Sequence, residues 1–245
     1  MTSSTQNSSS RDDPTEAQNR KSVRVAFILR SGALQPWQRR LIEEVYKDKN
    51  LELCYILNAA DPLEGQTGIA SSLLHLLERI ERKFFLPNHL TNSQAPDHVL
   101  SETTTLEISP KNLELADTLE KLSGLDVIVS LVPISNDFAM AIAAHSNLWA
   151  IAVGQSGDTS QTHVGFWEMF NRDGISSLSL LEISGDGAAR LAQSTVQQQF
   201  CYARNKCFLL EKSTPLVLRE LRRRASSDNR QVRNAETELG SAPTT

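Results

Sequence analysis

The chain has 245 residues, of which 40% are hydrophobic, 22% charged and 6% aromatic. This composition excludes collagen, coiled-coil and disulfide-scaffold proteins, and no apolar stretch reaches the roughly 18 to 20 residues that a membrane span needs. Because the N-terminus is polar and does not resemble a secretion signal, we expect a cytoplasmic protein. The net charge of −4 predicts no overall attraction to nucleic acid or anionic lipid, so we expect neither as a partner.

Both ends of the chain are polar. Residues 1–20 and 225–245 are rich in Ser, Thr, Asn, Gln and charged side chains, which cannot bury enough apolar surface to offset the entropy of ordering. We therefore expect two disordered tails, with one α/β domain between them at residues 21–224.

The domain opens with a β-α-β pattern. Residues 23–29 form a short apolar, β-branched run, which is typical of a strand buried on both faces. Pro36 fits the first turn of the helix that should follow, and residues 51–57 read as a second strand. Such a unit predicts a parallel sheet with a right-handed crossover.

The middle of the chain predicts an insertion and then a second β-α-β unit. An amphipathic segment at 69–85, a polar loop and a short strand near 105–108 should lie at the rim of the sheet. The regular elements that should follow are a helix from Ser109 and Pro110 to Leu122, strands at 126–132 and 149–153, and a helix at 138–144. The whole pattern predicts a Rossmann-like, mainly parallel sheet with helices on both faces.

A polar loop, residues 154–163, follows the strand that ends at Val153. Open α/β sheets bind ligands at the carboxyl ends of their strands, so this loop is the expected site. A helix from Gly165, a strand at 177–183, a turn at 184–187 and a helix at 202–224 should complete the domain. The run of three arginines at 222–224 suits a helix C-terminus, with a polyanion contact as the less favoured alternative.

Several common site types are unsupported. The sequence has no GxGxxG after the first strand, no Walker lysine motif and no GxSxG elbow. Its five histidines are scattered without the spacing of metal ligands, and its three cysteines, without such spacing either, are expected to be reduced packing residues. Ser31 and Gly32 are expected to form a simple turn, although backbone N–H groups there could receive an anion.

The second half of the chain resembles the catalytic domain of the folate-dependent formyltransferases, in particular a bacterial formyltransferase-like branch. The resemblance rests on the loop after Val153, on Gly-Phe-Trp-Glu at 165–168, on the strand at 177–181 and on Asp186 with Gly187. The segment Ser31 to Trp37 is also similar to that branch, and the similarity extends over about residues 23–223.

The resemblance implies transfer of a formyl group from 10-formyltetrahydrofolate to an amine, for which an amino sugar is one candidate. Enzymes of this family use an Asn and a His two residues apart at the end of a strand, with an Asp on a later turn. These groups suit the reaction because an oxyanion needs a donor, and the proton shuttle needs an orienting carboxylate.

Carried over by position, the family's Asn falls on Val153, its His on Gln155 and its Asp on Asp186. The loop Asp of the branch is retained as Asp158. Valine offers no donor, and a glutamine amide does not exchange protons near neutral pH, so acid–base catalysis worth about 100- to 10,000-fold would be lost. Asp186 also has an alternative interpretation, since Ser-Gly-Asp-Gly is good turn chemistry in any protein.

His163 lies on the same loop and is the candidate for a relocated base, with Asp158 or Asp186 as its carboxylate. A solvated loop histidine is the favoured alternative.

Two functions therefore stay open: a formyltransferase acting on folate and an amine, and a noncatalytic ligand- or partner-binding module on the same fold. Half of a Rossmann-like glycosyltransferase is a weaker third, because no donor-site motif is found. The aromatic pair Trp167 and Phe170 is expected in the core rather than in a ligand pocket.

Overall fold

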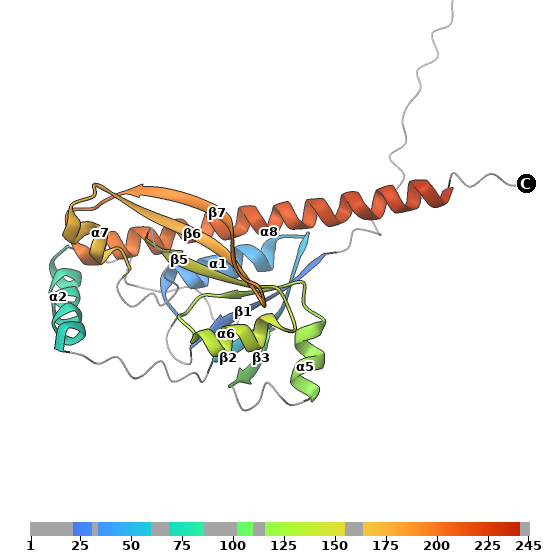
Figure 1. Ribbon diagram of the computed structural model, residues 1–245, viewed down its shortest axis with the longest axis horizontal. Helices are drawn as coiled ribbons and strands as arrows, with labels where there is room; N and C mark the ends of the chain where they lie inside the picture. Colours follow the sequence, from blue (N-terminus) through green and yellow to red (C-terminus); the bar gives the residue numbers. More distant parts are fainter. Residues whose placement is uncertain are drawn as a thin grey trace, which may run out of the picture.

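A computed structural model describes residues 22–30, 34–59, 69–85, 102–109, 116–154 and 164–240. Within them a sheet of seven strands is covered by helices (Figure 1). The strands are β1 (Val23–Leu29), β2 (Leu51–Ala59), β3 (Thr104–Ile108), β4 (Val127–Ser130), β5 (Leu148–Val153), β6 (Ile175–Ser184) and β7 (Gly187–Gln197). The helices are α1 (Pro36–Lys47), α2 (Ile69–Phe85), α5 (Ala116–Ser123), α6 (Asn136–Ala143), α7 (Phe166–Asn171) and α8 (Tyr202–Gly240).

The strand order is β3-β2-β1-β4-β5-β6-β7. The first five strands pair in parallel, whereas β6 pairs antiparallel with both β5 and β7. This arrangement confirms the predicted Rossmann-like, mainly parallel fold. The carboxyl ends of β1, β4 and β5 therefore lie at one end of the sheet, together with the beginning of β6.

Two apolar cores lie on the two faces of the sheet. Along β1, Val25 and Phe27 pack in the core that α1 and α8 cover, while Ala26 and Ile28 pack in the core beneath α5 and α6. Because all four side chains are buried, this strand has no polar face, as the apolar run in its sequence predicts. Figure 1 shows α1 and α8 on one side of the sheet and α6 on the other.

The sequence predictions hold for most elements. The strand at 23–29 and the amphipathic helix at 69–85 have their expected bounds, and β3 is an edge strand as expected. The helix expected from Ser109 is described only from Ala116, because residues 110–115 lie outside the described part of the chain, as does the turn at 31–32.

Two predictions near the C-terminus are wrong. No strand was expected after the turn at 184–187, yet β7 occupies Gly187–Gln197; it is an edge strand whose exposed face is polar, so its sequence carries few apolar residues. The closing helix does not end at Arg224 but continues to Gly240, so residues 225–240, assigned by composition to a tail, are helical.

The three arginines therefore do not lie at a helix C-terminus. Arg222 pairs with Asp48 at 2.7 Å, while Arg223 binds Glu220 at 2.6 Å and Arg224 lies 3.7 Å from Glu182. The contacts with Asp48 and Glu182 tie the middle of α8 to the rest of the domain. Among the described helices, none is long and apolar enough to cross a bilayer.

Candidate functional site

The expected site lies at the end of the sheet where β1, β4 and β5 finish. Helices α1 and α6 both begin there, after β1 and β4. The amide of Gln38 in the first turn of α1 donates a hydrogen bond of 2.8 Å to the carbonyl of Leu131 after β4. Ser135 caps α6 by accepting from the N–H of Phe138. These contacts fix the backbone between the end of β4 and the start of α6.

Val153, the last residue of β5, is buried, with 7% of its surface exposed. It belongs to the apolar core that α1 and α8 cover. At the position where the family resemblance calls for an Asn, the structure therefore has an apolar side chain packed among others, with no group that could donate to an oxyanion.

The loop that follows is held at both ends. Gly154, with a φ of 92°, donates its N–H to the carbonyl of Ser177 at 2.9 Å. At the other end Gly165 has a φ of 70° and forms the N-cap of α7. Residues 155–163 lie outside the described residues, so the structure does not place Gln155, Asp158 or His163.

Asn205 on α8 anchors the second end of the loop. Its fully buried amide donates to the carbonyl of Gly165 at 3.1 Å and lies 3.4 Å from the hydroxyl of Ser176, and its oxygen accepts from the N–H of Gln199 at 3.2 Å. Asn205 is not among the site residues expected from the sequence. The sequence signal for it is its spacing: Asn205 precedes Leu209 by four residues, so the polar amide falls on the same buried face of α8 as that apolar side chain.

Asp186 lies at the other end of the sheet. Because β6 runs antiparallel to β5, Leu178 pairs with Val153 whereas Ile183 pairs with Leu148, at the beginning of β5. Asp186 is exposed in the hairpin turn beyond, where the hydroxyl of Ser184 donates to the carbonyl of Gly187. The structure thus supports the turn interpretation and does not bring Asp186 together with the end of β5.

The separation follows from strand geometry. From Ser177, which is hydrogen-bonded to Gly154, to Ser184 the strand spans about 24 Å at about 3.4 Å per residue. Asp186, in the turn beyond Ser184, therefore lies about the length of β6 away from Ser177, the residue that is hydrogen-bonded to Gly154.

Two buried hydroxyl groups lie beside the end of β5. Ser177 and Ser179 on β6 are 7% and 1% exposed, and their Oγ atoms have no hydrogen-bond partner among the residues that the structure describes. Ser179 pairs with Ala152 of β5, and both serines alternate with Leu178 and Leu180, which face α8, so the hydroxyls lie on the α6 face. A buried hydroxyl without a partner costs about 1–3 kcal/mol.

The expected place of Trp167 and Phe170 in the core is wrong. Trp167 is 57% and Phe170 69% exposed, and their rings meet edge to face with centroids 6.0 Å apart. Phe166 instead turns inward, with its ring 5.6 Å from that of Tyr202 on α8. With only six residues in α7, the spacing of its aromatic residues did not show which of them face the core.

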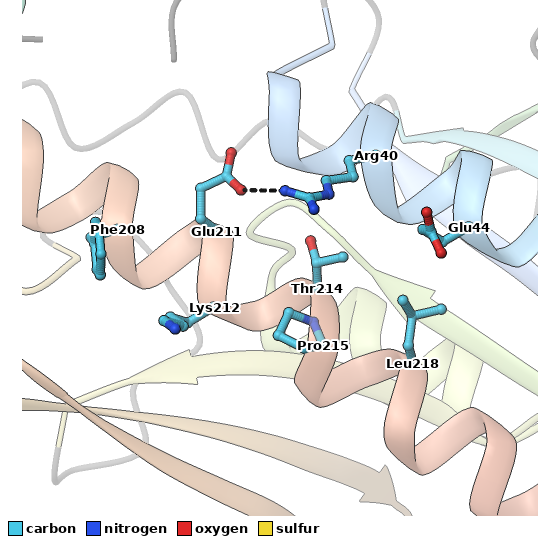
Figure 2. A pocket seen from close by; sticks show the side chains of 8 residues that line it. All are labelled: Arg40, Glu44, Phe208, Glu211, Lys212, Thr214, Pro215 and Leu218. Atoms are coloured by element: carbon cyan, nitrogen blue, oxygen red, sulfur yellow. Dashed lines mark ion pairs between the residues drawn. The ribbon is translucent and has the colours of Figure 1, made fainter. Parts of the chain in front are cut away.

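A hollow of about 430 Å³ opens elsewhere, between α1 and α8 (Figure 2). Its walls include Arg40 and Glu211, whose side chains pair across it at 3.7 Å, together with Pro215 in the middle of α8. It contains none of the residues predicted for the site. Its lining includes two basic side chains, Arg40 and Lys212, and two acidic ones, Glu44 and Glu211. Within the described residues no group of three or more His, Cys, Asp or Glu side chains is placed to hold a metal ion.

Comparison with known proteins supports the fold. No protein-family model matches the chain, and no curated protein matches its sequence. Among solved structures, phosphoribosylglycinamide formyltransferase from Brucella melitensis superposes with a TM-score of 0.52 and 11% identity, over 84% of this chain and 96% of that one. Glycinamide ribonucleotide transformylase 1 from Symbiobacterium toebii gives a TM-score of 0.50 and 7% identity, over 84% of this chain and 89% of that one. The chain therefore has a formyltransferase-like fold.

Proposed function

We propose that this chain keeps a formyltransferase-like fold without the transfer reaction and serves as a noncatalytic binding module. Formyl transfer needs an oxyanion donor, a proton shuttle and a carboxylate within hydrogen-bonding reach of one another. The proposal rests on how the sheet arranges the residues that the family resemblance assigns to those roles.

The register of β5 and β6 is the observation that carries the proposal. It puts Asp186 beyond the start of β5, while the loop that begins with Gln155 leaves from the other end. Asp186 is therefore not beside Gly154, where the loop leaves the sheet, and we infer that it does not orient a group there. Buried Val153 removes the donor as well.

The unpartnered hydroxyls of Ser177 and Ser179 support a retained ligand site. They lie beside the end of β5, on the α6 face, and a polar ligand atom would reach them only where the side chains packed over them move aside. Binding of this kind needs neither a titrating group nor the missing Asn.

The test is an assay of the full chain with 10-formyltetrahydrofolate and a panel of amines that includes amino sugars. We expect no formyl transfer above the uncatalysed rate. Turnover that His163→Ala abolishes would contradict the proposal and assign His163 as a relocated base, with Asp158 as its candidate partner.

A thermal-shift measurement with a folate analogue separates two forms of the module. A ligand that binds only the folded state stabilises it and so raises the melting temperature. At a ligand concentration of 100 times the dissociation constant, the stabilisation is about 2.7 kcal/mol. Stabilisation without turnover would identify a folate-binding module. No stabilisation by any folate would indicate that the folate pocket is lost and that the module binds another ligand or a partner.

A further inference from the structure

Helix α2 docks on α8 through its charged side. The buried carboxylate of Glu78 accepts from Arg82 at 2.7 Å, on the same helix, and from Lys206 of α8 at 3.1 Å. The carboxylate of Glu81 accepts from the N–H of Ala203 at 2.7 Å, in the first turn of α8, where the helix dipole favours a negative charge. Both acids of α2 are thus used in holding it to the domain.

The apolar side of α2 consequently faces outward. Leu76, Leu77, Ile80 and Phe84 are 54%, 41%, 48% and 69% exposed, and we call these four residues the α2 stripe. At about 100° per residue they fall within one arc of about 100° on the helix. An amphipathic helix ordinarily buries such an arc against its own domain, so the exposure of the stripe calls for an occupant.

Basic residues line one edge of the stripe. Arg79 and Lys83 are exposed and adjoin one edge of it by helical position, and Lys83 lies 5.9 Å from the ring of Phe84. The carboxylates of Glu78 and Glu81 are engaged with α8. The charged groups at this edge of the stripe are therefore the basic groups of Arg79 and Lys83.

Further exposed aromatic residues lie at the same end of the molecule, where Figure 1 shows α2, α7 and the beginning of α8 together. Phe85 packs edge to face on Phe200 at 5.5 Å, and Phe200 in turn lies beneath the guanidinium of Arg204 at 5.2 Å. Phe200 is 66% exposed. Apolar and aromatic side chains bordered by Lys and Arg are typical of helices that lie in the interface of an anionic membrane.

We propose that the α2 stripe docks on the surface of an anionic lipid bilayer. Leu76, Leu77, Ile80 and Phe84 enter the boundary between headgroups and acyl chains, and Arg79 and Lys83 meet lipid phosphates. The net charge of −4 still predicts no attraction of the whole chain to such a surface; the contact is local. It does not depend on whether the chain transfers formyl groups.

The test is co-sedimentation of the full chain with phosphatidylcholine vesicles, with and without phosphatidylserine. We expect binding to the vesicles that contain phosphatidylserine. The double variant Leu76→Ser, Ile80→Ser should weaken it by roughly 100-fold, since each apolar side chain buried contributes a factor of about ten or more. Reversing Arg79 and Lys83 to Glu should remove the preference for phosphatidylserine, whereas Met140→Ser on α6, also at an exposed apolar residue, should change nothing.

Each alternative occupant gives a different result. If the stripe is covered by another segment of this chain, the Leu76→Ser, Ile80→Ser variant unfolds at a clearly lower temperature. If it is covered by a second copy, sedimentation velocity shows a dimer that the variant dissociates. Either result, or no binding to vesicles that contain phosphatidylserine, overturns the proposal.

Discussion

Replacing Asn205 with alanine tests whether the end of the loop after β5 is held as the structure indicates. The side chain is fully buried and links three segments: Gly165 at the start of α7, Ser176 at the start of β6, and Gln199 before α8. Alanine retains the helix but removes every one of these hydrogen bonds.

The expected cost follows from the groups left without partners. The buried carbonyl of Gly165 loses its donor, which costs about 1–3 kcal/mol, and the buried hydroxyl of Ser176 loses a longer contact of 3.4 Å. The N–H of Gln199 is only half buried, so water replaces part of its bond. We expect a loss of about 2–4 kcal/mol in the free energy of unfolding.

Urea unfolding followed by tryptophan fluorescence measures this loss. The matched control is Gln198→Ala, which removes a hydrogen bond of 3.2 Å to the carbonyl of Ile175 at an exposed position and should cost less than about 1 kcal/mol. The slope of the transition should be the same in both variants. A loss for Asn205→Ala no larger than that of the control would refute the network as described.

Three further predictions concern the loop and the docking of α2. Gly165→Ala should destabilise by about 2–4 kcal/mol in the same urea assay, because φ is +70° and a Cβ would lie 2.6 Å from the Asn205 amide and from Leu209. Burial alone would raise the pKa of Glu78, but Lys206 and Arg82 outweigh it and lower the pKa from its ordinary value of 4.5. The stability that Glu78 contributes is therefore fully present above pH 4.5 and is lost as the pH falls through the pKa of the folded state. The stability difference between the natural chain and Glu78→Gln should therefore shrink under acid in pH-dependent unfolding, and a difference independent of pH would contradict the ion pairs. Gln155→His alone should not restore formyl transfer in the 10-formyltetrahydrofolate assay, because Val153 supplies no donor; full restoration would show that the donor is dispensable.

Much of the fold can be predicted from local patterns. The apolar run at 23–29 is buried on both faces, which leaves little choice besides a parallel strand, whereas the run at 51–57 is buried at Leu51, Ile56 and Leu57 and partly exposed between them. The edge strand β7 could not be found in this way, because only a few of its side chains, among them Ala192 and Val196, enter the core. The arginine run at 222–224 was expected to mark the C-terminus of α8. Instead Arg222 and Arg224 pair with carboxylates on other parts of the chain, which the sequence of the helix does not show.

Helix α2 shows a different limit. Its periodicity predicts the bounds 69–85, but periodicity defines an apolar face without showing what covers it. Here Glu78 pairs with Lys206 of α8, and Glu81 accepts a hydrogen bond from the N–H of Ala203 at the N-terminus of α8. Both contacts join residues more than 120 positions apart in the sequence. Those long-range partners decide the orientation, and no local pattern contains them.

The candidate site depended on the direction of one strand. A crossover connection after β5 would have made β6 parallel and put the turn with Asp186 beside the loop. Instead β6 starts next to the end of β5 and returns antiparallel, which sends Asp186 to the far end. The resemblance in sequence carried the residue types but did not contain this geometry.

The most direct test of the account is the distance between Gln155 and Asp186, measured by pulsed electron paramagnetic resonance. Spin labels would be attached at Gln155→Cys and Asp186→Cys in a chain whose Cys54, Cys201 and Cys207 are replaced by serine. The account predicts a separation above about 20 Å, set by the length of β6. A separation short enough for the two side chains to touch would contradict it, and would return Asp186 to a site shared with the loop.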